Sequence, residues 1–289
     1  MVLEILNWST DYLKEHQVEN PRLTAELLLA RSLSLSREEL YAHLQNPFKG
    51  EERDALERLI QRRISGEPLQ YILGYKEFWS IHFKVDPRVL IPRPETELLV
   101  EQSLLILSQT SLKRPPCLLE IGTGSGAIAI SLAKESRDSL IVATDISREA
   151  LLLAKENAQS AGVLHRIRFV NGDLFSPFRS WRDEGYFDLI LSNPPYIVRS
   201  EMEKLAREVK DFEPIVALDG GGDGLAFYRR IVSQASFYLR KGGWLLLEIG
   251  QGQGENVSKM IEKEGHFNPS ERLKDLSGIE RVVKAQMRT

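Results

Sequence analysis

The sequence has a single cysteine, and it lacks both a metal-binding histidine pattern and a long apolar run. With only Cys117, which sits in an apolar stretch and is expected to be buried, an intramolecular disulfide is excluded. The five histidines are scattered without ligand spacing, so we predict no metal site. No apolar run approaches the roughly 20 residues of a membrane span, and the N-terminus lacks the charged-then-apolar order of a signal peptide. We therefore expect a cytoplasmic protein with no membrane association.

An excess of positive charge is also missing, because 38 Lys and Arg stand against 41 Asp and Glu, the formal net charge is -3, and no dense run of Lys and Arg occurs. Tight, sequence-independent nucleic-acid binding relies on neutralising phosphates and is disfavoured, although a local basic groove is compatible with this charge. The 289 residues suffice for one large domain and a small one. The 42% hydrophobic and 27% charged fractions are those of a soluble globular protein.

Residues 1 to about 75 have the pattern of a small helical domain, which we assign to 1–76. Four helix starts are expected, at Ser9 or Thr10, at Asn20-Pro21, at a Ser36/Glu39 capping box and at Gly50. The spacing of Leu23, Leu27, Leu28 and Ala30 gives one apolar face, so these helices must pack on one another or on the rest of the chain. A scaffolding role and a partner-binding role both fit this pattern.

A linker is expected over residues 77–92. Residues 78–85 alternate like a strand, and 89–91 are predicted to pair with them across Asp86-Pro87-Arg88 in a β-hairpin. The run Pro92-Arg93-Pro94-Glu95-Thr96-Glu97 follows, and it is either a capped linker or part of a cleft. A helix is expected over 98–107.

From residue 117 the pattern alternates between strand and helix. Strands are expected at 117–121, 140–144, 167–170, 187–192 and 244–249, and helices at 127–133, 148–161, 224–239 and 257–264. The tail through 279–283 is expected to add an edge strand. Alternation of this kind predicts an α/β domain with a doubly wound, mostly parallel sheet over 93–289.

The stretch Ser192-Asn193-Pro194-Pro195-Tyr196 ends the fourth of these strands. Each proline ring fixes its own φ and pushes the preceding residue into the extended region, so the loop is rigid. The Asn193 side-chain oxygen and the Pro194 carbonyl are hydrogen-bond acceptors with little competing donation, and Tyr196 adds an aromatic face. Two close acceptors suit a planar NH2 group. We interpret the loop as a clamp for an amino group, with a plain Pro-Pro turn as the alternative.

A glycine-rich loop lies between the first strand and its helix, and it consists of Gly122, Thr123, Gly124, Ser125 and Gly126. Its glycines allow a tight turn and a close approach of a ligand. The loop has no Lys-Ser/Thr of a phosphate-binding loop, and its spacing differs from the dinucleotide fingerprint, so phosphate binding is disfavoured.

Acidic residues follow successive strands. Asp145 stands where a carboxylate can accept both hydroxyls of a ribose, Glu120 can face a cationic amino group, and Asp173 can meet an adenine amino group beside Leu174. Each acid alone is more often a helix cap or a solvated side chain. Together they describe a pocket for a nucleoside with an amino-acid tail and no phosphate, which is the chemistry of S-adenosylmethionine.

With these residues in view, the chain resembles the protein N5-glutamine methyltransferases that modify class I peptide chain release factors. The matching segments are Arg63 to Gly74, Leu90 to Glu97, Glu120 to Gly126, Asn193 to Tyr196, Asp219 to Leu225 and Leu247 to Gly250. The Asn-Pro-Pro-Tyr tetrad alone also occurs in DNA adenine and RNA guanine methyltransferases. The run from Pro92 to Glu97 favours the release-factor enzymes over relatives that act on a ribosomal protein.

The resemblance implies a class I S-adenosylmethionine-dependent methyltransferase fold, with S-adenosylhomocysteine as product. It implies that the substrate is the glutamine of a Gly-Gly-Gln loop in a class I release factor, docked by the helical domain. Asn193, Pro194 and Tyr196 would be catalytic, and together with Pro195 they would bind the substrate amide. Asn193 would also contact the cofactor. Leu174 departs from the aromatic residue found in some relatives, which weakens the expected stacking on adenine.

Two other function classes compete with this interpretation. One is methyl transfer to an exocyclic amino group of DNA or RNA, which salt-sensitive binding to nucleic acid would favour. The other is a binding module that keeps the cofactor fold without turnover, against which the intact acceptors of the clamp argue. We expect no direct nucleic-acid substrate and no catalytic histidine.

Overall fold

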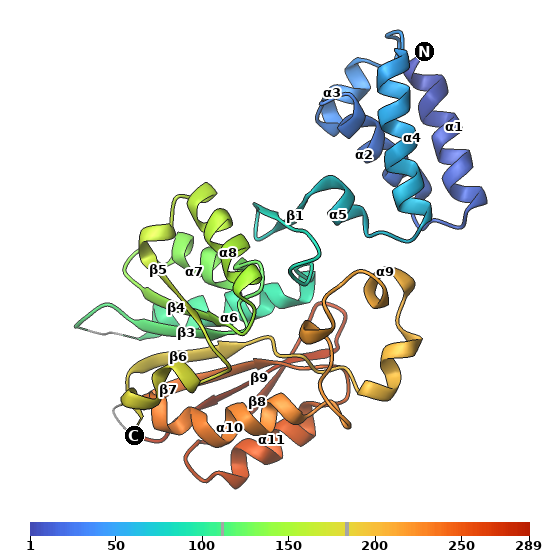
Figure 1. Cartoon of the computed structure of the whole chain (residues 1–289). Helices are drawn as coiled ribbons and strands as arrows, with labels where there is room; N and C mark the ends of the chain where they lie inside the picture. The colour runs from blue at the N-terminus through green and yellow to red at the C-terminus, as the bar shows by residue number, and fades with distance from the viewer. Residues whose placement is uncertain (111–112, 183–184) are drawn as a thin grey trace. The chain divides into compact units, whose positions relative to one another are not determined.

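The computed structural model describes residues 1–110, 113–182 and 185–289. Two compact units are present (Figure 1), one formed by Met1–Tyr75 with Ala206–Phe212 and the other by Lys76–Leu205 with Glu213–Thr289. The domain boundaries expected at residues 76 and 92 stay predictions. Residues 206–212 belong to the helical unit although they lie far along the chain, which no sequence pattern had indicated.

The first unit is helical. Its helices are α1 (Val2–Glu15), α2 (Pro21–Ser32), α3 (Arg37–Ala42), α4 (Gly50–Ile64), α5 (Leu69–Leu73) and the short α9 (Arg207–Lys210). The predicted capping box at the start of α3 is confirmed, because Ser36 Oγ accepts from Glu39 N and Glu39 Oε2 accepts from Ser36 N. The predicted start of the first helix is wrong. That helix begins at Val2, and Thr10 donates its hydroxyl to the Leu6 carbonyl inside the helix.

The segment 206–212 is held to the helical unit by α4. Arg63 Nη1 lies 2.9 Å from Glu208 Oε2, and the Arg63 side chain is only 12% exposed. A Cβ added at Gly66, just after α4, would lie 3.2 Å from the Arg207 side chain, so a small residue permits this close approach. The helical unit is therefore closed by a piece of chain inserted from the larger unit's sequence.

The predicted pairing of residues 78–85 with 89–91 is wrong, although a β-hairpin is present in this part of the chain. The strands are β1 (Tyr75–Phe78) and β2 (Ile81–Lys84), and the turn between them uses Trp79 and Ser80, both at positive φ. Neither residue is the glycine or asparagine that such a turn favours, so the sequence contains no sign of a turn at this point. The prediction of a single strand over residues 78–85 is therefore wrong. Residues 89–91, expected to pair with it, instead contribute Val89 and Leu90 to the lining of a pocket.

The second unit is built on a mostly parallel sheet, as predicted. Within the described residues its order is β5-β4-β3-β6-β7-β9-β8. The strands are β3 (Cys117–Ile121), β4 (Leu140–Asp145), β5 (Ile167–Asn171), β6 (Phe187–Ser192), β7 (Leu239–Glu248), β8 (Glu271–Lys274) and β9 (Glu280–Gln286). The tail strand β9 is not the edge strand that was expected. It lies between β7 and β8 and is antiparallel to both.

Helices cover both faces of this sheet (Figure 1). They are α6 (Glu97–Gln109), α7 (Ala127–Glu135) and α8 (Arg148–Ser160) on one face, and α10 (Ala226–Tyr238) and α11 (Gly254–Lys263) on the other. Alternate residues of a strand enter opposite cores, as with Leu118 on the α7 face and Leu119 on the α10 face. Strands buried on both faces read as continuous apolar runs, which explains why the central strands were predicted accurately.

The strand order reverses next to β3. From β3 the chain proceeds outward through β4 and β5, then returns to place β6 on the other side of β3. Ile121 is in register with Thr144 of β4 and with Ser192 of β6, so the three strands end together. Such a switch point, at the carboxyl ends of parallel strands, is where open α/β sheets bind ligands. In the part of the chain that the structure describes, no helix is both long and apolar enough to cross a membrane.

Candidate active site

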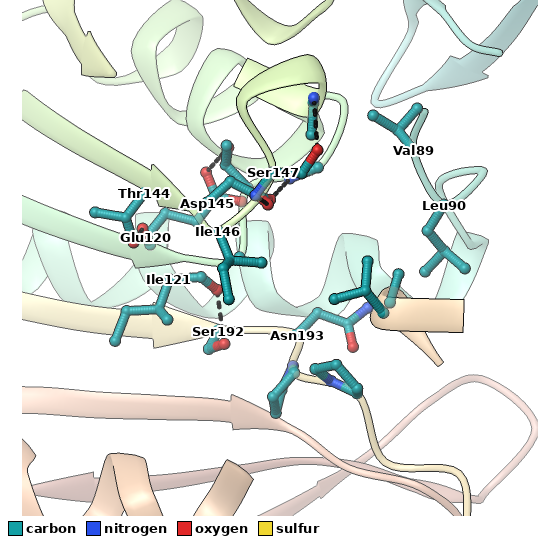
Figure 2. A pocket seen from close by; sticks show the side chains of 18 of the residues that line it. Val89, Leu90, Glu120, Ile121, Thr144, Asp145, Ile146, Ser147, Ser192 and Asn193 are labelled. Atoms are coloured by element: carbon teal, nitrogen blue, oxygen red, sulfur yellow. Dashed lines mark hydrogen bonds between the residues drawn. The ribbon is translucent and has the colours of Figure 1, made fainter. Parts of the chain in front are cut away.

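A pocket opens at this switch point (Figure 2). Of the residues predicted from the sequence, those that line it are Glu120, Gly122, Thr123, Gly124, Ser125, Asp145, Asp173, Leu174, Asn193, Pro194 and Pro195. Gly126 and Tyr196 do not line it. The fold thus brings together side chains from the ends of β3, β4, β5 and β6, which are up to about 70 residues apart in the sequence.

The glycine-rich loop leaves space for a ligand close to its backbone. Gly122 and Gly124 have φ values of +76° and +54°, which favour glycine, and a Cβ built on either would meet nothing within 4 Å. Gly126 differs, because a Cβ there would lie 2.8 Å from Ile130 Cδ1 and 3.2 Å from Ala154 Cβ. Its observed role is close packing of α7 on α8, whereas its predicted role in cofactor binding stays a prediction.

Glu120 is a buried acid at the carboxyl end of β3. It is only 1% exposed, and its Oε2 accepts hydrogen bonds from Thr123 Oγ1 at 2.7 Å and from Ala129 N at 3.1 Å. Burial raises the pKa of this carboxyl to about 8, against the lowering effect of those two donors. The group is therefore mostly neutral at pH 7 in the free protein, and a cation placed beside it would favour its ionised form.

Asp145, at the end of β4, is fixed by two backbone donors. Gly124 N donates to Oδ2 and Ser147 N donates to Oδ1, both at 2.9 Å (Figure 2). Burial raises the pKa of Asp145. Each carboxylate oxygen can accept more than one hydrogen bond, so the group retains the capacity to accept two ligand hydroxyls.

The third predicted acid, Asp173, lines the pocket but is paired with a cation, which the sequence did not indicate. Its carboxylate forms an ion pair with Arg230 of α10, and both side chains are nearly half exposed. Leu174 beside it has a φ of +49° and is 8% exposed. Phe227, one turn before Arg230, also lines the pocket. It supplies an aromatic ring that sequence reasoning missed, because its position in an amphipathic helix resembles that of a core residue.

The loop after β6 is anchored before it enters the pocket. Ser192 Oγ donates to the Ile121 carbonyl at 2.7 Å, and Asn193 Nδ2 donates to Thr96 Oγ1 at 3.2 Å. Tyr196, which was predicted to belong to the clamp, packs its ring against the buried core, and burial raises the pKa of its hydroxyl to about 12. Its predicted catalytic role stays a prediction, and its observed contacts are structural.

Tyr196 is held by a second loop. Gln253 Nε2 donates to the carbonyl of Tyr196 at 2.9 Å and to that of Gly224 at 3.3 Å, while Gln253 Oε1 accepts from Gly250 N. A Cβ at Gly224 would lie 2.6 Å from both the Tyr196 carbonyl oxygen and Gln253 Nε2. The clamp loop therefore rests on a backbone surface that only glycine allows.

Gly224→Ala is expected to lower turnover and to destabilise the fold by about 1–3 kcal/mol, because the new methyl group must displace the Tyr196 carbonyl. Gly252→Ala is the matched control. Gly252 has a similar φ of +82° but nothing within 4 Å of its added Cβ, so this variant carries the backbone strain without the clash. Thermal unfolding and turnover of both variants measure the difference. Equal losses in the two would show that the contact with Tyr196 is unimportant.

The run from Pro92 to Glu97, which the sequence left open between linker and cleft, contributes to the pocket through Pro92, Arg93 and Thr96. Arg93 Nη2 lies 2.6 Å from Oε1 of Glu213, whose side chain is 1% exposed. Arg88, also in the lining, is paired with Asp86 at 2.6 Å. Charged residues confined between prolines were the only sequence signal for this wall.

Two family models match the chain. Residues 4–74 match the family described as PrmC N-terminal domain, and residues 99–210 match the one described as methyltransferase small domain. A methyltransferase from Pyrococcus furiosus has a similar structure, with a TM-score of 0.52 and 17% identity over 79% of this chain and 98% of that one. The larger unit therefore has the methyltransferase fold that the sequence predicted.

Two other proteins have a higher sequence identity to this chain, and they match it over nearly its whole length. The release factor glutamine methyltransferase of Geobacter sulfurreducens is 44% identical over 98% of this chain and 95% of its own length. The protein of the same name from Rhodopirellula baltica is 38% identical over 99% of this chain and 96% of its own. Identity at this level, over both units, shows that the chain belongs to the release factor glutamine methyltransferase family.

Proposed function

We propose that this protein transfers a methyl group from S-adenosylmethionine to the side-chain amide nitrogen, N5, of the glutamine in the Gly-Gly-Gln loop of a class I peptide chain release factor. The observation that carries the proposal is the position of Asn193, which enters the same pocket as Glu120 and Asp145 from the neighbouring strand. Membership of the family supports the choice of glutamine as the acceptor.

The residues of the pocket fit S-adenosylmethionine. Asp145 would accept the ribose hydroxyls, Glu120 would face the amino group of the methionine part, and Gly122 and Gly124 leave room beside the backbone. Leu174, which follows Asp173, and Phe227, one turn before its partner Arg230, are apolar residues of the lining, on the side where we place the adenine. When bound, this cofactor supplies an electrophilic methyl group, and its demethylated product is S-adenosylhomocysteine.

The clamp acts on the substrate amide. An amide nitrogen is a weak nucleophile because its lone pair is delocalised into the carbonyl. Asn193 Oδ1 and the Pro194 carbonyl would accept its two N–H groups and hold the nitrogen in line with the methyl group, and such positioning can contribute up to about 7–11 kcal/mol. The methylated nitrogen is strongly acidic and loses its proton to solvent, so no histidine base is needed.

The cations of the pocket argue against a nucleic-acid substrate. Arg88, Arg93 and Arg230 line it, and each forms an ion pair with a carboxylate of this chain. Phosphate binding would have to compete with those pairs. A protein loop carries no phosphates and can bind without breaking these ion pairs. The paired cations therefore favour a protein substrate.

The buried carboxyl of Glu120 predicts that cofactor binding releases a proton. Its pKa of about 8 leaves it mostly protonated at pH 7, and the neutral form cannot balance an ammonium group. Affinity should therefore rise with pH between about 6 and 7.5, where the amino group of the ligand stays charged. Calorimetry at pH 7 in two buffers of different ionisation enthalpy should give a release close to one proton. Glu120→Gln should abolish this proton release. A binding heat of the wild-type protein that is the same in both buffers would contradict the role of Glu120 in binding the ligand's amino group.

Methyl transfer from labelled S-adenosylmethionine tests the proposed function. Purified class I release factor, the same factor with its loop glutamine replaced, DNA and RNA are offered separately. Label on the intact factor only is the expected result. Label on nucleic acid would retain the fold and the cofactor site but overturn the substrate, and absence of label on every acceptor would overturn the proposal.

A further inference from the structure

The side chain of Asn193 has two nearly isosteric ends with opposite chemistry. Only its oxygen can accept a hydrogen bond from a substrate amide, so a clamp requires Oδ1 toward the substrate and Nδ2 away from it. A freely rotating amide would present the wrong end part of the time. The groups behind Asn193 therefore decide whether the clamp works.

Two buried residues, Thr96 and Glu248, lie behind it. Ser192, the last residue of β6, is in register with Leu247 of β7, so Asn193 directly after β6 is level with Glu248, the last residue of β7. Glu248 is 2% exposed and Thr96 is 5% exposed. Thr96 Oγ1 accepts from Asn193 Nδ2, while Glu248 Oε2 has no hydrogen-bond partner among the described residues. An acceptor of this kind is costly to bury unless it has a use.

We propose that Thr96 and Glu248 are positioning residues that fix the amide of Asn193 with its oxygen toward the substrate. The proposal rests on the proposed function. Ionised Glu248 can only accept, so the single Thr96 proton is directed to its carboxylate, and the Thr96 oxygen is left to accept from Asn193 Nδ2. Donation then runs in one direction, from Asn193 through Thr96 to Glu248.

The protonation state of Glu248 controls this direction. Burial raises the pKa of Glu248 to about 7, while the neighbouring polar side chains of Thr96 and Asn193 oppose the rise. Among the charged neighbours, Glu95 raises this pKa and Arg281 lowers it. Burial and Glu248 together raise the pKa values of Tyr196 and Tyr228, and Tyr228 donates its hydroxyl to the Glu248 backbone carbonyl at 2.9 Å. Both hydroxyls therefore stay neutral near pH 7. Protonated Glu248 is a donor, so it no longer requires the Thr96 proton. The orientation of the Asn193 amide is therefore held above about pH 7 and lost below it.

Glu248→Gln tests the chain of donors with a side chain of the same shape. The new amide can donate to Thr96 or to Asn193 Oδ1, which favours the wrong orientation. At saturating cofactor and release factor, kcat should fall between about 10- and 100-fold and lose its acidic limb near pH 7. Cofactor affinity and the KM for the factor should stay within about threefold of wild type, because neither ligand contacts this residue.

Thr96→Val and Thr96→Ser form a matched pair that decides the question even if Glu248→Gln folds poorly. Valine removes the hydroxyl and should lower kcat at least about 10-fold, whereas serine keeps it and should stay within about threefold of wild type. Equal losses in both, or a Glu248→Gln protein with unchanged kcat and pH profile, would overturn the inference. Failure of the wild-type protein to methylate the glutamine would instead refute the proposed function.

Discussion

Asn193→Ala should lower kcat by about 100- to 1,000-fold, the cost expected when a single group that holds the reacting centre is removed. Asn193 lines the pocket at the end of β6, and its side chain is oriented by Thr96. Alanine leaves the amide nitrogen of the substrate with one acceptor, the Pro194 carbonyl, so it is no longer fixed in line with the methyl group. Cofactor affinity should change by less than about threefold, because the loss falls on the substrate side.

Steady-state kinetics with intact release factor, together with calorimetry of the cofactor, separate these two effects. Asn268→Ala is the control, since Asn268 is an exposed residue of the same type outside the pocket. Unchanged turnover in Asn193→Ala would remove the clamp from the mechanism. A parallel loss of cofactor affinity would move Asn193 from the substrate to the cofactor.

Asp145→Ala should weaken S-adenosylmethionine binding by at least about 100-fold. A partly buried carboxylate that accepts two hydroxyls makes two charge-assisted hydrogen bonds, each contributing about 1.5–3 kcal/mol. The substitution also leaves Gly124 N and Ser147 N without their acceptor, which loosens the glycine-rich loop. The dissociation constant, measured by calorimetry, is the direct readout.

Two further variants make that result interpretable. Asp145→Asn keeps the shape and one acceptor oxygen, so it should lose less affinity than the alanine variant. Asp54→Ala alters an exposed acid of the helical unit and should bind as wild type does. Wild-type affinity in Asp145→Ala would show that the ribose lies elsewhere.

The sheet and most of its helices could be predicted because their signals are local. Strands buried on both faces, such as β3 and β6, are short apolar runs between turn residues, and α4 starts at Gly50, as predicted. The errors have physical causes. The turn at Trp79–Ser80 adopts positive φ without glycine. The position of β9 depends on pairing with β8, a mostly charged strand of four residues that is too short to recognise.

The cofactor side of the site could be predicted further than the substrate side. Acids at successive strand ends are placed by the sheet, so their order in the sequence gives their neighbours in space. Thr96 and Glu248 are different, because they approach Asn193 from a distant segment and from a neighbouring strand. No pattern in the sequence relates these three residues. Only the register of β6 with β7 and the hydrogen bond to Thr96 bring them together.

The site of methylation is the measurement that tests the central claim most directly. Release factor treated with the wild-type protein and S-adenosylmethionine is digested, and fragmentation mass spectrometry locates the added methyl group. The account predicts one methyl group on the side-chain nitrogen of the glutamine in the Gly-Gly-Gln loop, and none when Asn193→Ala is used for the same time. A methyl group on another residue of the factor, or on the glutamine in equal amount with Asn193→Ala, would contradict it.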